Sequence, residues 1–362
     1  MIPRLQVGIL GATGMVGQNY IRLLENHPWF SITYLAASPQ SAGRKYAEVI
    51  ADRWLMSTPV PEPVRNLVVG DANEVSSAQG KCQLLFSAVD LDKKAAEALE
   101  VAYAAAGFAV VSNHSAHRMT PDVPMIIPEI NPDHLEVIAH QRRARGWDKG
   151  CIAVKSNCSI QSYMTPLWAW MQAGYHPRRI VLSTLQAVSG AGYPGVPSLD
   201  MVDNIIPFIK GEEEKSELEP LKIFGRLENG VIVPDSELAI SAHCNRVPVV
   251  DGHTACVSVA FDGRKPELEE TIRLWRGFRS VPQQLNLPSA PQEPIVYRDE
   301  PNRPQPRKDR DIDQAMAVVV GRLRPCKVFD LRFVGLHHNT VRGAAGGAIL
   351  TAELMAQRGI IV

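Results

Sequence analysis

The sequence has no excess of either charge and no long apolar stretch. Lysine plus arginine and aspartate plus glutamate both number 38 in 362 residues, so no strong field would attract nucleic acid or an anionic membrane surface. No apolar run reaches the roughly 18 residues that a membrane-spanning helix needs. We therefore expect no nucleic-acid partner and no membrane, and instead a small molecule or another subunit.

The six cysteines are scattered, without a CxxC pair or the Cys/His spacing of a zinc site. They offer no disulfide framework of the kind that short secreted chains carry. The first residues, MIPRLQVGIL, run into a strand-like segment, and we expect no signal peptide. These absences predict no bound metal and a reducing, cytoplasmic setting. The composition, 45% hydrophobic and 21% charged, is typical of a globular chain with room for two domains.

A strand, a glycine-rich turn and a helix succeed one another near the N-terminus. Residues 5–10 are a short apolar run, and glycines follow at three-residue steps before an amphipathic segment at 16–24. This order opens a dinucleotide-binding fold, because glycine backbone can approach a pyrophosphate and a helix N-terminus offers free N–H groups. Thr13 adds a hydroxyl donor. A purely structural turn is the alternative.

The second predicted strand, residues 31–38, bears on the choice of cofactor. An NAD-binding enzyme usually places Asp or Glu at its end to accept from the ribose 2′-OH. Here Ser38 and Ser41 stand close to Arg44 and Lys45, which suits a 2′-phosphate. The sequence thus favours NADP over NAD, with a solvated basic loop as the alternative.

Strand and helix patterns alternate up to about residue 156. Residues 82–90 and 108–113 read as buried strands and residues 92–107 as an alanine-rich helix, which predicts an α/β fold with a Rossmann-type doubly wound parallel sheet. Later strands, in 178–195 and 245–263, are longer, and we expect them to form an antiparallel sheet. That second unit is predicted to be an α+β domain for substrate binding and dimerisation.

The C-terminal third adds two expectations. Residues 282–306 carry seven prolines, too many for a sheet interior, and we expect an extended excursion over the surface. Residues 337–359 predict one long helix of small residues that packs back on the first domain. The expected division is therefore 1–156 with 341–362 for NADP binding, and 157–340 for catalysis and dimerisation.

Residues 155–162 read KSNCSIQS and place Cys158 between a strand and a predicted helix that starts at Ile160. A helix N-terminus there would stabilise a thiolate, although a buried inert cysteine is the commoner interpretation of such a position. His253 and Arg246 stand among valines and Gln186 at a strand end before a glycine turn. Taken singly, each has an ordinary structural interpretation.

Together these motifs meet a family pattern. GATGMVG, SNCS, QAVSGAG, EEEK, NRVPV and VRGAAGGA occur in this order, and the chain resembles aspartate-β-semialdehyde dehydrogenase of the fungal and archaeal type over essentially its whole length. Ser-Ile follows the motif cysteine where Ser-Thr is usual. The resemblance implies that Cys158 forms an acyl-enzyme, that His253 is the acid–base group, and that Gln186 orients the substrate.

The resemblance also implies the binding residues. Arg246 would hold the substrate α-carboxylate, Glu212 the amine, and Arg118 and Lys215 the phosphate, while Asn157 lines the site. The positions that match cofactor contacts in such enzymes are Gly11, Thr13, Gly14, Met15, Val16, Ser38, Ser41, Ser87, Gly190 and Asn339.

The implied reaction is the NADPH-dependent reductive dephosphorylation of L-4-aspartyl phosphate to L-aspartate 4-semialdehyde through a cysteine thioester. It belongs to the pathway to lysine, threonine, methionine and isoleucine, and the implied assembly is a homodimer or homotetramer. A malonyl-CoA reductase with the same thiol chemistry is one alternative. A dinucleotide-sensing protein without catalysis is another.

Overall fold

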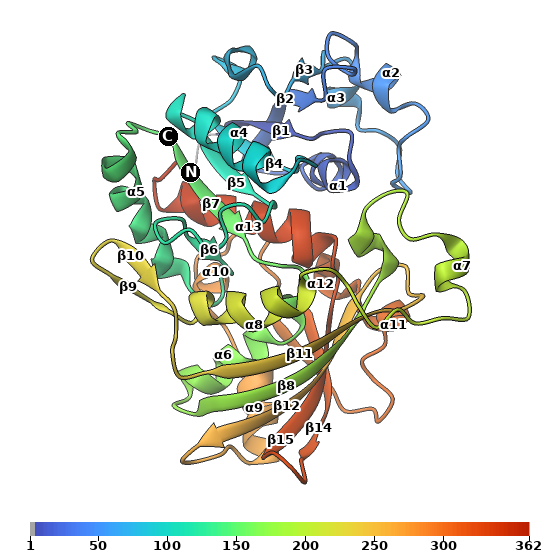
Figure 1. Cartoon of the computed structure of the whole chain (residues 1–362), viewed down its shortest axis with the longest axis vertical. Helices are drawn as coiled ribbons and strands as arrows, with labels where there is room; N and C mark the ends of the chain where they lie inside the picture. The colour runs from blue at the N-terminus through green and yellow to red at the C-terminus, as the bar shows by residue number, and fades with distance from the viewer. Residues whose placement is uncertain (1–3, 362) are drawn as a thin grey trace.

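The computed structural model describes residues 4–361 and has two parts stacked along its long axis (Figure 1). The upper part is built on a seven-stranded sheet of order β3-β2-β1-β4-β5-β7-β6, in which every pairing is parallel. Its strands are β1 Leu5–Leu10, β2 Phe30–Ala37, β3 Gly70–Asp71, β4 Leu84–Ser87, β5 Ala109–Ser112, β6 Met125–Ile126 and β7 Cys151–Lys155.

Helices cover both faces of this sheet, so the predicted doubly wound architecture is confirmed. Alternate strand residues point to opposite faces: Leu85 and Val110 pack with α4, whereas Phe86 and Val111 pack with α1 and α13. The helices of the upper part are α1 Met15–Leu23, α2 Tyr46–Ile50, α3 Glu62–Arg65, α4 Lys93–Ala105, α5 Val137–Arg145 and α13 Gly346–Gln357, with 3-10 turns η1 Val75–Ala78 and η2 Pro132–Glu136.

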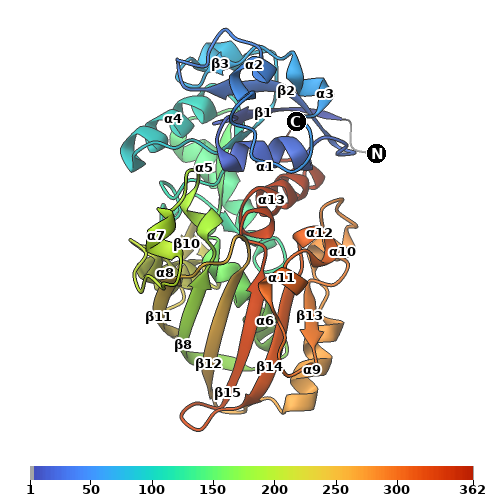
Figure 2. The same ribbon diagram turned by 90° about the vertical axis from the view of Figure 1, so that its right-hand side faces the viewer.

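The last helix returns the chain to the first sheet. Ten of the twelve residues of α13 are buried, and the helix contacts α1, β5 and β7. Figure 2 shows α13 lying between α1 and the lower part. The sequence predicted one helix over 337–359. Instead, His337 is the last residue of strand β15, residues 341–345 form a π-helical turn, η5, and α13 begins only at Gly346.

The lower part is built on a six-stranded sheet of order β11-β8-β12-β15-β14-β13. The expectation of an antiparallel sheet is only partly right: the four central strands are antiparallel, while β11 and β13 pair in parallel at the two edges. Its strands are β8 His176–Gln186, β11 Ala239–Arg246, β12 His253–Asp262, β13 Ile295–Arg298, β14 Val318–Pro325 and β15 Leu331–His337, beside a separate hairpin of β9 Arg226–Glu228 and β10 Val231–Val233.

Only one face of the six-stranded sheet is fully covered. Trp170 of α6 and Trp275 of α9 pack on Leu182 and Phe333 of the inner face, whereas Val181 and Leu185 on the outer face are exposed. The remaining elements of the lower part are α6 Met164–Gln172, α7 Ser198–Met201, α8 Glu212–Ile223, α9 Leu268–Gly277, α10 Val281–Gln284, α11 Pro306–Asp309 and α12 Ile312–Ala315, with 3-10 turns η3 Ser159–Ser162 and η4 Val188–Ala191.

The proline-rich segment is more ordered than expected. Residues 282–306 include most of α10 and the edge strand β13, so the expectation of a wholly extended excursion is wrong. The prolines fall before and after β13, which pairs with β14 on one side only. An edge position tolerates nearby prolines because no second neighbour needs their missing N–H groups.

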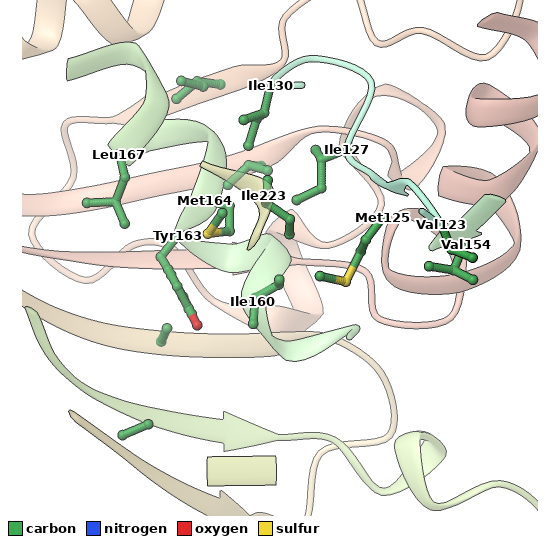
Figure 3. Close-up of a cluster of buried hydrophobic side chains, with 14 of the residues drawn as sticks. Val123, Met125, Ile127, Ile130, Val154, Ile160, Tyr163, Met164, Leu167 and Ile223 are labelled. Carbon is green, nitrogen blue, oxygen red and sulfur yellow. The ribbon is translucent and has the colours of Figure 1, made fainter. Parts of the chain in front are cut away.

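A buried cluster joins the two parts. Met125 and Val154 from the first sheet meet Ile160, Met164 and Ile223 from the following turn and helices (Figure 3). Each such apolar side chain contributes roughly 1.5–3 kcal/mol when fully buried. Ile160 lies two residues after Cys158, so this cluster fixes the turn that presents the thiol.

Among residues 4–361, no helix is both long and apolar enough to cross a membrane. The same residues contain no group of three or more His, Cys, Asp or Glu side chains that could hold a metal ion.

Candidate active site

Cys158 lies at the junction of the two parts. The strand β7 ends at Lys155, and Cys158 immediately precedes the four-residue turn η3. The expectation of a helix from Ile160 is wrong, because the α-helix begins only at Met164. The thiol therefore has no full helix N-terminus behind it, and its surroundings are set by side chains brought from elsewhere.

The nearest of these side chains is His253, the first residue of β12. Its Nε2 lies 3.5 Å from the Cys158 sulfur, and its Nδ1 accepts the backbone N–H of Ala187 at 3.0 Å. The ring is fully buried. Burial, followed by the charges of Arg246 and Lys155, holds the pKa of His253 well below its usual value.

Opposing groups act on the thiol itself. Burial and the Glu212 carboxylate raise the pKa of Cys158, while the positive charges of Lys155, Arg118 and Arg246 lower it. The balance leaves the pKa above the ordinary cysteine value. The positive groups thus offset only part of the desolvation cost of a thiolate.

Glu212 is the centre of the predicted substrate residues. Its carboxylate accepts from Asn157 Nδ2 at 2.9 and 3.1 Å, from Gln186 Nε2 at 3.1 Å and from Lys215 Nζ at 2.8 Å. Burial raises the pKa of Glu212, but Lys215, Gln186 and Asn157 outweigh burial and hold that pKa below its usual value. Three predicted residues, one from each of three separate motifs, therefore meet at the carboxylate of a fourth.

Arg246 ends β11, directly opposite Gln186 in the register with β8. Its Nη1 donates to the Ala187 carbonyl at 2.7 Å. A Cβ atom on Gly190 would lie 2.9 Å from Arg246 Nη1 and 3.1 Å from His253 Cε1. A side chain at the glycine of QAVSGAG would therefore crowd both the guanidinium and the imidazole.

Arg118 is held by a residue that sequence reasoning missed. Its Nη1 donates to Glu219 Oε1 at 2.8 Å, and the other oxygen of Glu219 accepts the backbone N–H of Asn157 at 2.5 Å. Glu219 thus connects the predicted phosphate-binding arginine to the turn that carries Cys158. Its only sequence signal is its position seven residues after Glu212, on the same face of α8.

Lys222 extends the same face of α8 and was also missed. Its Nζ donates to the carbonyls of Arg118, Thr120 and Val123 at 2.7, 2.7 and 2.8 Å. Burial lowers the pKa of Lys222, but three acceptors need three N–H donors, which only the ammonium form has. The loop that presents Arg118 is therefore fixed from beneath by α8.

The glycine-rich turn fits a dinucleotide phosphate. Gly11 has φ +80°, and a Cβ there would lie 2.3 Å from the Ala88 carbonyl oxygen. Gly14 caps α1 without any side-chain hydrogen bond, and a Cβ there would meet only one atom, at 3.6 Å. The N-terminus of α1 therefore has no side-chain cap and has open space beside Gly14, which fits a pyrophosphate bound at the helix N-terminus.

The other predicted cofactor residues have different surroundings. Thr13, Met15 and Val16 are half-buried at the start of α1, and Ser38 is exposed while Ser41 is buried after β2. The Ser87 hydroxyl donates to Glu100 at 2.6 Å. Asn339 donates to the Ser189 hydroxyl at 2.8 Å and accepts from the Gly252 N–H at 2.8 Å, close to Gly190.

The chain is similar to known proteins over nearly its whole length. Residues 6–138 match the family description "Semialdehyde dehydrogenase, NAD binding domain", and residues 167–342 match "Semialdehyde dehydrogenase, dimerisation domain". Aspartate-semialdehyde dehydrogenase from Methanothermobacter thermautotrophicus is 49% identical over 353 residues, which is 97% of this chain and 99% of the relative. The chain belongs to the aspartate-semialdehyde dehydrogenase family.

Fungal members of the aspartate-semialdehyde dehydrogenase family are similar over equal lengths. The protein from Cryptococcus neoformans is 42% identical over 369 residues, covering 99% of each chain. A crystal structure from Candida albicans, described as the enzyme with NADP, superposes with a TM-score of 0.90 at 40% identity and covers 99% of this chain and 100% of its own. The predicted family and fold are thereby confirmed.

Proposed function

We propose that this chain reduces L-4-aspartyl phosphate to L-aspartate 4-semialdehyde and releases phosphate, with NADPH as the reductant. The observation that carries the proposal is the convergence of a thiol, an imidazole and charged groups of both signs at the junction of the two parts. A carboxylate and an arginine suit an α-amino acid, and Arg118 with Lys215 suits a phosphate. The family relatives named above support the same activity.

The proposed roles follow from the geometry. Arg246 offers a planar fork for the α-carboxylate, which a lysine could not match, and Glu212 accepts from the α-ammonium. The Cys158 thiolate attacks the acyl carbon, and the C–O bond to phosphate breaks, with the departing charge held by Arg118 and Lys215. When bound, NADPH supplies the hydride that reduces the resulting thioester to the aldehyde. Hydride addition gives a tetrahedral oxyanion, which then collapses to the aldehyde as the C–S bond breaks and the Cys158 thiolate is released.

The cofactor residues proposed are the glycine-rich turn and the serines after β2. Gly11, Gly14 and the start of α1 would hold the pyrophosphate, and Ser38 and Ser41 the ribose phosphate. Because the Ser87 hydroxyl donates its proton to Glu100, it could only accept a hydrogen bond from the cofactor. Asn339 and Gly190 lie near His253 and Arg246 and are proposed to border the nicotinamide.

We propose the domain division 1–156 with 341–362, and 157–340. The burial of α13 against β5 and β7 supports joining the C-terminal residues to the first sheet. The packing of α6 on β8 and α9 supports starting the second domain after β7. The cytoplasm is the proposed compartment, since all six cysteines are free thiols.

For the oligomer we propose a pair of copies that meet through the outer face of the six-stranded sheet. Val181 and Leu185 of β8 and Cys256 of β12 are exposed there, in the part that matches the dimerisation-domain description. Exposed apolar side chains on an otherwise polar, uncovered sheet face are commonly part of an interaction surface. A dimer would use this face alone, and a tetramer would need a second one.

The test is an assay of NADP reduction with aspartate semialdehyde plus phosphate, compared with malonate semialdehyde plus coenzyme A. The proposal expects phosphate-dependent turnover with the first pair only. Turnover with the second pair would favour a CoA-thioester reductase, a reaction for which Glu212 has no evident use. Absence of turnover with both, together with an unreactive Cys158 towards iodoacetamide, would favour a nucleotide-sensing protein.

A further inference from the structure

Lys155 is a buried side chain for which the proposed reaction has no use. It is the last residue of β7, stands three residues before Cys158, and follows Val154 of the buried cluster in Figure 3. Only 2% of its surface is exposed. An ammonium group taken out of water costs several kcal/mol unless an anion or a full set of acceptors compensates it. The partners of Lys155 therefore decide whether its charge has a function.

Three other buried cations of residues 4–361 are compensated within the protein. Arg118 donates to Glu219 at 2.8 Å. Arg342 donates to Glu129, also at 2.8 Å. Lys222 donates to three backbone carbonyls, one for each N–H of its ammonium group. These three charges are therefore paired or fully hydrogen-bonded in the chain alone.

Two buried cations have no such compensation among the described residues. Arg246 donates to a backbone carbonyl and forms no ion pair, and the proposed function assigns it the substrate α-carboxylate. Lys155 forms no ion pair either, and its Nζ has a single acceptor, the Ser156 carbonyl at 2.6 Å. Two of its three N–H groups remain. By the reasoning that applies to Arg246, the counter-charge of Lys155 is an anion that forms during the reaction.

The Cys158 thiol is placed to supply that anion. Both side chains pack on the segment that runs from η5 into α13. A Cβ atom on Gly343 would lie 3.1 Å from Cys158 Cβ, and one on Gly347 would lie 3.4 Å from Lys155 Cε. The cavity beside Lys155 and Gly347 has a volume of about 10 Å³, which is room for about one water molecule. Little water therefore screens the ammonium from the sulfur.

The two charges act on each other in both directions. Burial lowers the pKa of Lys155 to about 7, and the charge of the Cys158 thiolate is the strongest of those that raise it again. Lys155 is in turn the strongest of the positive charges that lower the pKa of Cys158. The other charged and titratable groups that face this pair are Arg118, Glu129, Glu212, Glu219, Arg246, His253, His337 and Arg342.

We propose that Lys155 is the buried counter-charge of the Cys158 thiolate, a positioning residue that acts through the sulfur by its charge and does not touch the substrate. Ionisation of the thiol breaks only the S–H bond. The proton goes to Nε2 of His253 or to solvent, and the sulfur keeps the electron pair. This inference rests on the proposed function, which makes Cys158 the nucleophile, although the ionisation itself needs no substrate.

The direct test is the pH dependence of Cys158 alkylation by iodoacetamide, followed on the Cys158 peptide by mass spectrometry. Lys155→Met keeps the length of the side chain and removes its charge. We expect the midpoint of the rate profile to move up by about one pH unit, which lowers the rate at pH 7 about tenfold. An unmoved midpoint would overturn the proposal. No substrate is present, so the result does not depend on whether aspartyl phosphate is the true one.

Two further variants separate charge from hydrogen bonding and from remote effects. Lys155→Gln keeps an N–H donor for the Ser156 carbonyl, and we expect it to move the midpoint as far as Lys155→Met does. A wild-type midpoint in Lys155→Gln would mean that the hydrogen bond matters and the charge does not. Lys327→Met, in the exposed loop between β14 and β15, removes the same charge where solvent and salt screen it, and its midpoint should stay within about 0.2 pH units.

Thermal unfolding distinguishes this role from a structural one. Replacing an uncompensated buried charge by an apolar side chain should leave the Tm unchanged or raise it. A lower Tm in Lys155→Met together with an unmoved alkylation midpoint would show that Lys155 serves the fold alone.

Steady-state kinetics with aspartate semialdehyde, phosphate and NADP extend the test to turnover. Lys155→Met should lower kcat about tenfold at pH 7 and leave the KM for phosphate within about twofold, because the change acts on the thiol. Raising the pH should restore kcat towards the wild-type value. A raised KM with an unchanged kcat would contradict the proposal. A wild type without turnover would instead refute the proposed function and leave the alkylation result standing.

Discussion

At the scale of single residues, Glu212 and Glu219 of helix α8 have different roles. Glu212 faces Asn157, Gln186 and Lys215, and we propose that it accepts from the substrate amine. Glu219 is not proposed to contact the substrate itself. It accepts from Arg118 Nη1 and from the backbone N–H of Asn157, and both of these residues are proposed to contact the substrate. A carboxylate that holds an arginine in place acts on the substrate indirectly, and its loss should have a different kinetic signature.

We predict that Glu219→Gln raises the KM for phosphate, measured with aspartate semialdehyde and NADP, by about tenfold. The Arg118–Glu219 pair is nearly buried, and removing one charge leaves the guanidinium without its counter-ion. The KM for NADP should stay within about twofold, since Glu219 contacts none of the proposed cofactor residues and substitutions without shared partners have nearly independent effects. Glu214→Gln, on the exposed side of α8, is the matched control. A rise in both KM values would contradict the positioning role.

Cys158→Ser should lower kcat by about 10³-fold or more, because an alcohol at this position has no means of ionising. The affinity for NADPH should be nearly unchanged, since the Cys158 thiol is not one of the proposed cofactor contacts. Fluorescence titration with NADPH beside steady-state assay would check both. Turnover at the wild-type rate would rule out the covalent scheme.

At the scale of elements, helix α4 carries an unusual buried carboxylate. Glu100 accepts from the hydroxyls of Ser87 and Ser112 at the ends of β4 and β5, and its other oxygen has no hydrogen bond and lies 3.8 Å from His117 Nε2. Burial raises the pKa of Glu100 to about 7. The carboxyl group is therefore protonated in the folded chain over a range in which the unfolded chain has lost the proton.

This shift predicts the sign of a pH effect on stability. A carboxyl group whose folded pKa is raised contributes stability that is present below pH 4.5 and is lost as pH rises through about 7. Relative to Glu100→Gln, the wild type should lose up to about 3 kcal/mol of unfolding free energy between pH 4.5 and 8. Urea unfolding of both proteins across this range checks the prediction. A constant difference would contradict it.

Several elements were predictable because their signals are local. The apolar run, glycine turn and amphipathic helix of residues 5–24 lie within one stretch, and β1 with α1 forms there. Glu219 and Lys222 were not, because their partners are about a hundred residues away in sequence. A helix face with charges at such spacing has the same pattern whether it meets solvent or the loop of another domain.

The nucleophile turn shows the same limit. KSNCSIQS is compatible with a helix from Ile160, yet the chain forms a short 3-10 turn. The hydroxyl and N–H of Ser159 both bond to the Asn157 side chain, at 2.6 and 2.7 Å, and this local capping competes with helical bonds. Motif resemblance named the residues of this turn, but only tertiary contacts fix its backbone.

At the scale of the whole molecule, the six-stranded sheet has helices packed on one face only, and its outer face is open. Val181 and Leu185 are 40% and 36% exposed on this outer face, whereas the side chains on the inner face of the same sheet are buried in the core. We predict that Leu185→Asp, alone or with Val181→Asp, lowers the molar mass measured by light scattering on elution. Val328→Asp, in the loop between β14 and β15, is the control. An unchanged mass in the double variant would place the interface elsewhere.

The return of α13 to the first sheet has a consequence for synthesis. Phe86, Val111 and their neighbours pack on α13 as well as α1, yet residues 346–357 are among the last to be translated. While the ribosome is making the second sheet, the face that awaits α13 stays bare, and a chain stopped early would offer it to chaperones or to other chains. The nucleotide-binding half is the first to begin folding and the last to finish.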